Sequence, residues 1–133
     1  MALIKKKIIN PHRIRGIDGG FSFIPHRFLT GGFVSSLDQK ELLVYFFLVL
    51  VSDRYGLSFY SYDAICSLLE LSVDEYLAAR DGLIEKDLIA FDGTLFQVLE
   101  LPKKPTGHSR PPQGHGLIAQ LIRTSLQEDT GGR

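Results

Sequence analysis

A run of ten consecutive apolar residues, Leu42 to Val51, constrains the fold more than any other feature of the chain. The run, LLVYFFLVLV, is about half the roughly 20 residues that a membrane-spanning helix needs. Ser36 and Gln39 precede it with capping-box spacing, in which each side chain bonds the backbone amide of the other residue. We therefore predict a helix from about Leu37 to Val51, buried on most sides.

The residues after this run predict a brief strand, two more helices and a hairpin. Residues 57–60 alternate as a strand does, and a helix is expected from Tyr62 to about Glu70. A second capping-box pattern, Ser72 with Glu75, opens a helix from Val73 to about Lys86. Two strand-like runs then flank Asp92-Gly93, a two-residue turn signal that is typical of a β-hairpin.

Several side chains outside these patterns are expected to contribute to the core. They include Cys66, as a small apolar residue, and four aromatic residues of the lead-in, Phe21, Phe23, Phe28 and Phe33. Arg80 lies on the apolar stripe of the helix that begins at Val73. We expect its guanidinium to extend to an acid such as Glu70 or Asp63.

The order of these elements is that of a winged helix-turn-helix, and residues 23–89 resemble that superfamily. The motifs on which the resemblance rests are FIPHRFL, LDQKELLVYFFLVL, YSYDAICSLLELS and LIEKDLI. The chain resembles DnaD-type and phage replication protein N-terminal domains most. That family usually ends its third helix with Lys-Gly-Leu-Ile, and Asp87 stands in place of the glycine. Aspartate tolerates the left-handed backbone better than most residues.

The resemblance implies a mainly α, α/β fold with a three-helix core and a β-hairpin wing. It also implies that the helix from Val73 enters the DNA major groove. The positions that would face the groove include Asp74, Glu75, Ala78 and Asp81, none of which can neutralise a phosphate. These four residues are therefore our candidates for docking a protein partner.

Charge is distributed unevenly along a chain whose formal net charge is zero. Residues 1–20 hold five basic residues and one acid, residues 21–102 hold five and twelve, and residues 103–133 hold five and two. Affinity for duplex DNA comes mainly from Lys and Arg contacts with phosphate. The candidate nucleic-acid-binding residues are thus mostly in the two basic ends: Lys5, Lys6, Lys7, Arg13, Arg15, Lys86, Lys103, Lys104 and Arg110.

We divide the chain into four parts. These are a basic N-terminal arm (residues 1–20), a winged-helix domain (21–102), a Pro/Gly-rich linker (103–116) and a short amphipathic helix with a tail (117–133). The last part is too short to be a stable helix alone in water. Its apolar residues are therefore candidates for binding a partner: Leu117, Ile118, Leu121 and Ile122.

The resemblance and the distribution of charge predict two alternative functions for the chain. The first is a winged-helix DNA-binding protein for transcription control or replication of bacterial, phage or mobile-element DNA, with double-stranded DNA as its partner. The second is a protein-interaction module in a nucleoprotein assembly, which docks a partner or a second copy through the acidic helix and the C-terminal helix.

We expect no enzyme, because no nucleophile–base pair, metal-ligand set or phosphate-binding loop can be assembled from the sequence. No cofactor, metal or small-molecule substrate is therefore predicted. The lone cysteine fits a reducing compartment, and no signal peptide or membrane span is recognised. We expect a cytoplasmic protein.

Overall fold

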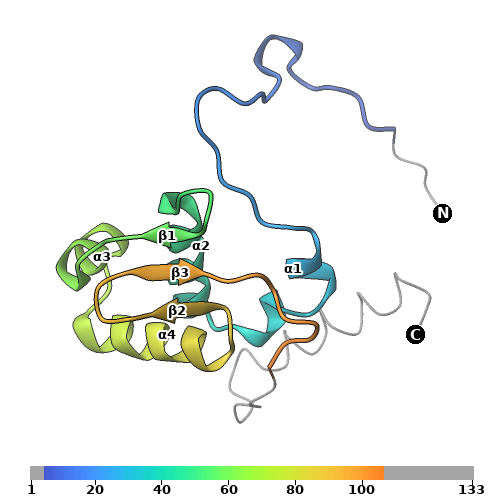
Figure 1. Cartoon of the computed structure of the whole chain (residues 1–133). Helices are drawn as coiled ribbons and strands as arrows, with labels where there is room; N and C mark the ends of the chain where they lie inside the picture. Colours follow the sequence, from blue (N-terminus) through green and yellow to red (C-terminus); the bar gives the residue numbers. More distant parts are fainter. Residues whose placement is uncertain (1–4, 107–133) are drawn as a thin grey trace.

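The structure is a computed structural model that describes residues 5–106 of the chain. Within this range the fold is mixed α/β and mainly helical, with a small antiparallel sheet (Figure 1). The α-helices are α1 (Arg27–Thr30), α2 (Gln39–Val51), α3 (Tyr62–Leu69) and α4 (Val73–Glu85). Two short 3-10 turns, η1 (Pro11–Arg13) and η2 (Val34–Ser36), precede α1 and α2 respectively.

The apolar run forms α2, but a different pair of residues starts the helix. The predicted capping box of Ser36 and Gln39 is wrong. Asp38 is the N-cap instead: its carboxylate accepts from the Glu41 amide at 2.8 Å, and the Glu41 side chain accepts from the Asp38 amide at 3.0 Å. The hydroxyl of Ser36 donates to the carbonyl of Phe33, so Ser36 closes the preceding 3-10 turn.

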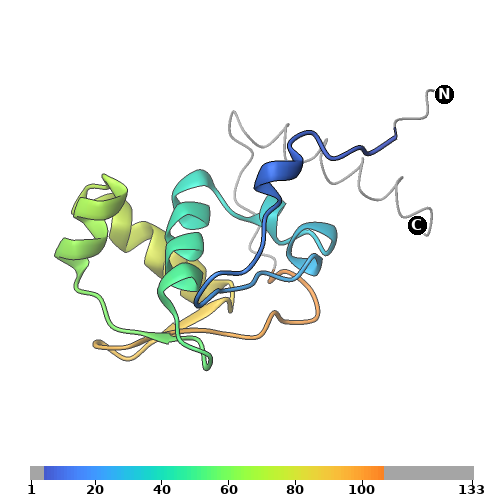
Figure 2. The ribbon, with the colours of Figure 1, turned by 90° about the horizontal axis from the view of Figure 1, so that it is seen from above.

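The sheet has three antiparallel strands in the order β1-β3-β2. They are β1 (Leu57–Ser58), β2 (Ile89–Phe91) and β3 (Phe96–Val98), so the central strand is the last one in the chain. All of the longer helices lie on one face of this sheet (Figure 2). The core therefore forms where α2 and α4 pack on each other and on β2 and β3.

The helix starts and ends of the C-terminal half follow the sequence closely. Ser72 and Glu75 form the predicted capping box at the start of α4. Asp87, just after α4, has the left-handed backbone expected of it, with φ of 65°. The hairpin differs from the prediction, because Phe91 pairs with Phe96 and leaves a loop of four residues, Asp92 to Leu95, in place of two.

One expectation about burial is wrong in part. Phe28 and Phe33 lie in the core, but Phe21 and Phe23 are 69% and 76% exposed. They lie in the extended segment that precedes α1 (Figure 1). Helix α2 is buried on most sides, as predicted, and its one exposed apolar face holds Leu43, Phe46 and Leu50. No helix within residues 5–106 combines the length and the apolar character that a bilayer crossing requires.

Candidate nucleic-acid and partner interface

The first turn of α4 carries two of the candidate partner-binding residues. Asp74 is exposed, whereas Glu75 is held by the Ser72 amide, which donates to its carboxylate at 2.9 Å. Lys40 of α2 also lies 3.2 Å from the Glu75 carboxylate. These contacts, led by the amide of Ser72, lower the pKa of Glu75 from its ordinary value. Glu75 is thus part of the helix cap and of a link to α2, and Asp74 is the more available of the two.

The outer face of α4 continues as an acidic surface with an apolar floor. Ala78 and Asp81 are both exposed, as we predicted. Together with Gly82, Ile84 and Glu85 they line a hollow of about 400 Å³. Within residues 5–106, no lysine or arginine lines this hollow. The face can therefore accept an apolar group flanked by a cation, but it lacks the donors that bind phosphate.

Arg80, the one arginine of α4, is directed to the sheet side of the helix. Its guanidinium lies over the rings of Tyr76 and Phe91, at 5.7 Å and 5.1 Å from the ring centres. It also pairs with its neighbour Asp81 at 3.0 Å. The expected partners Glu70 and Asp63 are therefore wrong. Helical spacing could not have indicated Phe91, because that residue comes from the following hairpin.

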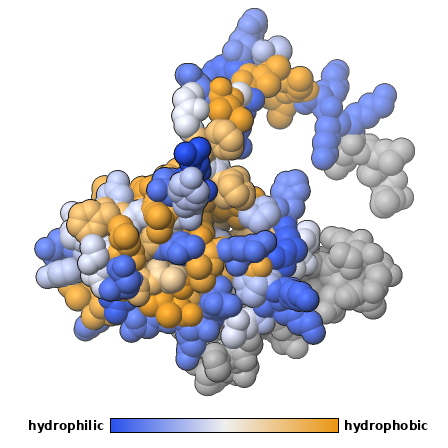
Figure 3. Space-filling view, viewed as in Figure 1, coloured by the Kyte–Doolittle hydropathy of each residue, from blue (hydrophilic) through white to orange (hydrophobic). Residues whose placement is uncertain are grey.

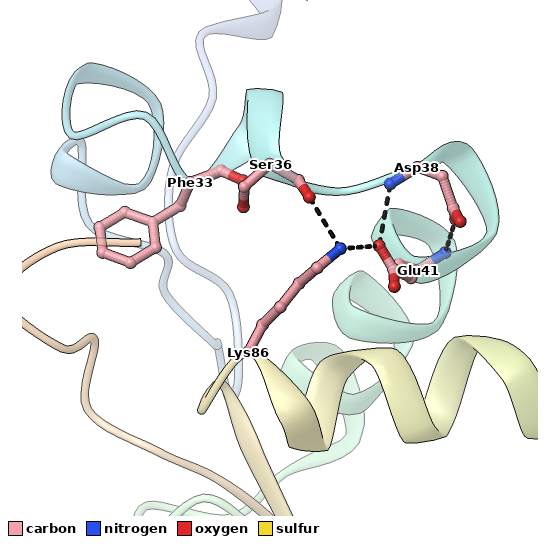
Figure 4. Close-up of polar contacts among 5 residues, drawn as sticks. All are labelled: Phe33, Ser36, Asp38, Glu41 and Lys86. Carbon is pink, nitrogen blue, oxygen red and sulfur yellow. Dashed lines mark hydrogen bonds and ion pairs between the residues drawn. The ribbon is translucent and has the colours of Figure 1, made fainter. Parts of the chain in front are cut away.

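Lys86 cannot serve in the predicted nucleic-acid-binding set, because its side chain is only 4% exposed. The ammonium is 2.6 Å from Oε1 of Glu41, which is fully buried, and donates to the carbonyl of Ser36 at 2.8 Å (Figure 4). A cation held in the interior by a carboxylate and a carbonyl does not reach a phosphate. Lys86 is a structural residue that joins the end of α4 to the start of α2.

The loop between β2 and β3 is also acidic. Asp92 accepts from the amides of Thr94 and Leu95 at 2.8 Å and 2.7 Å, and these bonds fix the turn. The same bonds, led by that of Leu95, lower the pKa of Asp92. The loop contains no basic residue, so it offers no charge for a DNA backbone.

The N-terminal arm places its cations in solvent. Five of the predicted nucleic-acid-binding residues are exposed on it, and none forms an ion pair with any residue in the range 5–106: Lys5, Lys6, Lys7, Arg13 and Arg15. Asn10 caps the short turn η1, because its side chain accepts from the His12 amide at 3.0 Å. The arm projects from the body and carries both polar and apolar residues (Figure 3).

At the other end of the domain, Arg27 of α1 holds the departing chain. Its guanidinium donates to the carbonyls of Leu101 and Pro102 at 2.9 Å each. Lys103 and Lys104 follow directly and are exposed. Nothing in the sequence pattern indicated the role of Arg27. The remaining predicted residues lie outside the described range: Arg110, Leu117, Ile118, Leu121 and Ile122.

Comparison with known proteins identifies no relative of this chain. No family model matches the chain, and no curated protein or solved structure matches it. The fold and the placement of charge are therefore the features that bear on function.

Proposed function

We propose that this chain is a winged-helix DNA-binding protein that acts in transcription control or replication of bacterial, phage or mobile-element DNA. The element order α2, β1, α3, α4, β2, β3 supports the winged-helix assignment. So does the antiparallel pairing of β1 with β3, which attaches the hairpin to the strand between the first two core helices. Helices α3 and α4 then form the helix-turn-helix.

The observation that carries the DNA-binding proposal is the separation of charge. The largest group of exposed cations without an ion pair in residues 5–106 lies on the N-terminal arm, whereas α4 and the β2–β3 loop present Asp74, Asp81 and Asp92. In this mode the arm follows the phosphate backbone or enters a minor groove, as the arms of other helix-turn-helix proteins do. Helix α4 then contributes register and, through its carboxylates, contact with cytosine amino groups.

The test is a titration of duplex DNA with the full chain at several salt concentrations, followed by fluorescence anisotropy. Lys5→Gln removes one arm cation, and Arg54→Gln removes one exposed cation of the body. We expect Lys5→Gln to reduce the slope of log affinity against log salt by about one unit. The slope of Arg54→Gln stays at the wild-type value. Absence of salt-dependent binding to any duplex overturns the proposal.

A second candidate function is favoured by the hollow on α4. Its lining combines Ala78 and Ile84 with the acidic residues Asp81 and Glu85, which suits a cationic protein segment better than a phosphate backbone. In this alternative the chain is an interaction module in a nucleoprotein assembly, and a protein or a second copy of the chain occupies the hollow through basic residues.

Light scattering over a range of protein concentrations tests the self-association version of this alternative. The self-association version predicts a dimer for the wild type and a monomer for Ala78→Arg, because the added cation fills the hollow. Ser67→Arg, on the exposed face of α3, is the matched control and stays dimeric. A wild-type chain that is monomeric at every concentration rules this version out.

A further inference from the structure

The outer face of α2 carries an apolar stripe that the rest of the described range leaves partly exposed. Leu43, Phe46 and Leu50 are 41%, 42% and 72% exposed, although they belong to the most apolar helix of the protein. Contiguous exposed apolar surface of this kind is usually a binding site. We name these three residues the α2 stripe.

The spacing of the α2 stripe indicates the shape of what binds there. Its members are three and four residues apart, which is the repeat that two packed helices use to interlock their side chains. The distance along the helix from Leu43 to Leu50 is about 10 Å, at 1.5 Å per residue. A second, short amphipathic helix is the element that such a stripe fits.

The chain leaves the domain at α1, which also contacts one member of this stripe. Arg27 fixes the departing carbonyls of Leu101 and Pro102, and its neighbour Phe28 contacts Phe46 with ring centres 6.1 Å apart. At the far end of the stripe, the hydroxyl of Ser22 donates to the carbonyl of Leu50 at 3.2 Å. Figure 2 shows the N-terminal segment running past α2 before the chain turns into α1. Phe21 and Phe23, which flank Ser22 in the sequence, are both exposed.

The sequence that follows supplies an occupant of the right size. Beyond Thr106 come ten residues rich in proline and glycine, 107–116, and then LIAQLIRTSL, residues 117–126. The ten linker residues can span roughly 33 Å when extended. As a helix, residues 117–126 would be about 14 Å long and would present apolar side chains on one face, matching the stripe.

We propose that residues 117–126 bind the α2 stripe of the same chain as an additional helix, which covers this face of α2. The attachment of the linker at α1 makes this binding intramolecular, with a high effective concentration. That compensates for the low stability of so short a helix on its own. A second copy of the chain has no such advantage. The inference is independent of the DNA-binding proposal, since no residue of the arm's cation set takes part.

Tryptophan fluorescence tests this proposal directly, because the chain contains no tryptophan. Leu50→Trp places a reporter on the stripe, and Leu68→Trp places a matched reporter on the exposed side of α3. In the full-length protein we expect the Leu50→Trp emission to lie at shorter wavelength than the Leu68→Trp emission. Adding Leu121→Asp and Ile122→Asp should shift the first emission to longer wavelength and leave the second unchanged.

Three outcomes overturn the proposal. The two reporters show the same emission, the aspartate substitutions leave the Leu50→Trp emission in place, or the emission depends on protein concentration, which indicates a second copy. The unfolding midpoint of each variant checks folding. Leu50 is mostly exposed, and the aspartates lie outside the domain, so neither change disturbs the core described above. A DNA titration of the same variants separates this result from the proposed function.

Discussion

The ammonium of Lys86 lies 2.6 Å from the carboxylate of Glu41, and the two side chains are 4% and 0% exposed. The pair joins residues 45 positions apart in the chain, at the end of α4 and in the first turn of α2. Glu41 also accepts from the Asp38 amide, so one carboxylate serves a helix cap and an ion pair (Figure 4). A buried pair of charges therefore links the end of α4 to the start of α2.

Removing one member of this pair should destabilise the protein strongly. Lys86→Met leaves a buried carboxylate without its cation, and we expect the free energy of unfolding to fall by about 3–5 kcal/mol. The double variant Lys86→Met/Glu41→Gln should be more stable than Lys86→Met, because it buries no charge and the new amide oxygen can still accept from the Asp38 amide. Urea denaturation measures both.

The exposed pair of Lys40 and Glu75 provides the control for this experiment. Their side chains are 52% and 40% exposed, so Lys40→Met should change the free energy of unfolding by no more than about 1 kcal/mol. If Lys86→Met costs as little as Lys40→Met, the buried pair does not hold α2 and α4 together.

Gly82 gives a second prediction about the same contact. Alanine normally stabilises a helix relative to glycine by about 1 kcal/mol, but a Cβ at position 82 would overlap Oε2 of Glu41. That carboxylate cannot move freely, because Lys86 and the Asp38 amide hold it. We therefore expect Gly82→Ala to lower the midpoint of thermal unfolding.

The variant Glu41→Gln/Gly82→Ala shows whether the contact with Glu41 is the cause. With Glu41→Gln, the ion pair with Lys86 no longer fixes the side chain at position 41, so its amide group can shift away from the new methyl group. Gly82→Ala should therefore cost less in the Glu41→Gln background than in the wild type. A rise in the midpoint on Gly82→Ala alone would contradict the close approach of α2 and α4.

Local patterns in the sequence predicted α3, α4 and the Asp87 turn, because each depends on residues a few positions apart. The Ser72–Glu75 cap is an example. The start of α2 was predicted incorrectly, since Asp38 with Glu41 competes with Ser36 and Gln39 for the same role. Aspartate and serine are similarly good caps, and the ion pair with distant Lys86 favours Glu41. No spacing rule contains that information.

The candidate site shows the same division between local and long-range information. The exposure of Asp74, Ala78 and Asp81 follows from the helical period, so it was predictable. The position of Lys86 was not, because its burial depends on a carboxylate from another helix. Arg80 likewise stacks on Phe91, which the hairpin brings to it. Charge counts locate basic segments, whereas tertiary contacts determine which individual cations remain available.

Asp87 offers a prediction at a position where the backbone itself carries strain. Its φ of 65° lies in the left-handed region, which costs a non-glycine residue about 1–2 kcal/mol and costs aspartate less than most. Asp87→Gly should therefore raise the free energy of unfolding by roughly 0.5–1 kcal/mol, after the greater freedom of glycine in the unfolded chain is counted. Asp87→Ala should lower it. The opposite order of these two variants in urea denaturation would show that the turn does not need this conformation.

Acid should weaken the β2–β3 loop through Asp92. The amides of Leu95 and Thr94 donate to its carboxylate and lower the pKa of Asp92 below the ordinary value of about 3.8. The unfolded chain therefore takes up the proton first, and the stabilisation is complete above that value and is lost as the pH falls through the folded pKa. Asp92→Asn keeps the oxygen that accepts both bonds but does not titrate. We expect the wild type to lose more stability than Asp92→Asn when urea denaturation is followed from pH 6 to pH 3. Equal losses would mean that the carboxylate charge does not strengthen the turn.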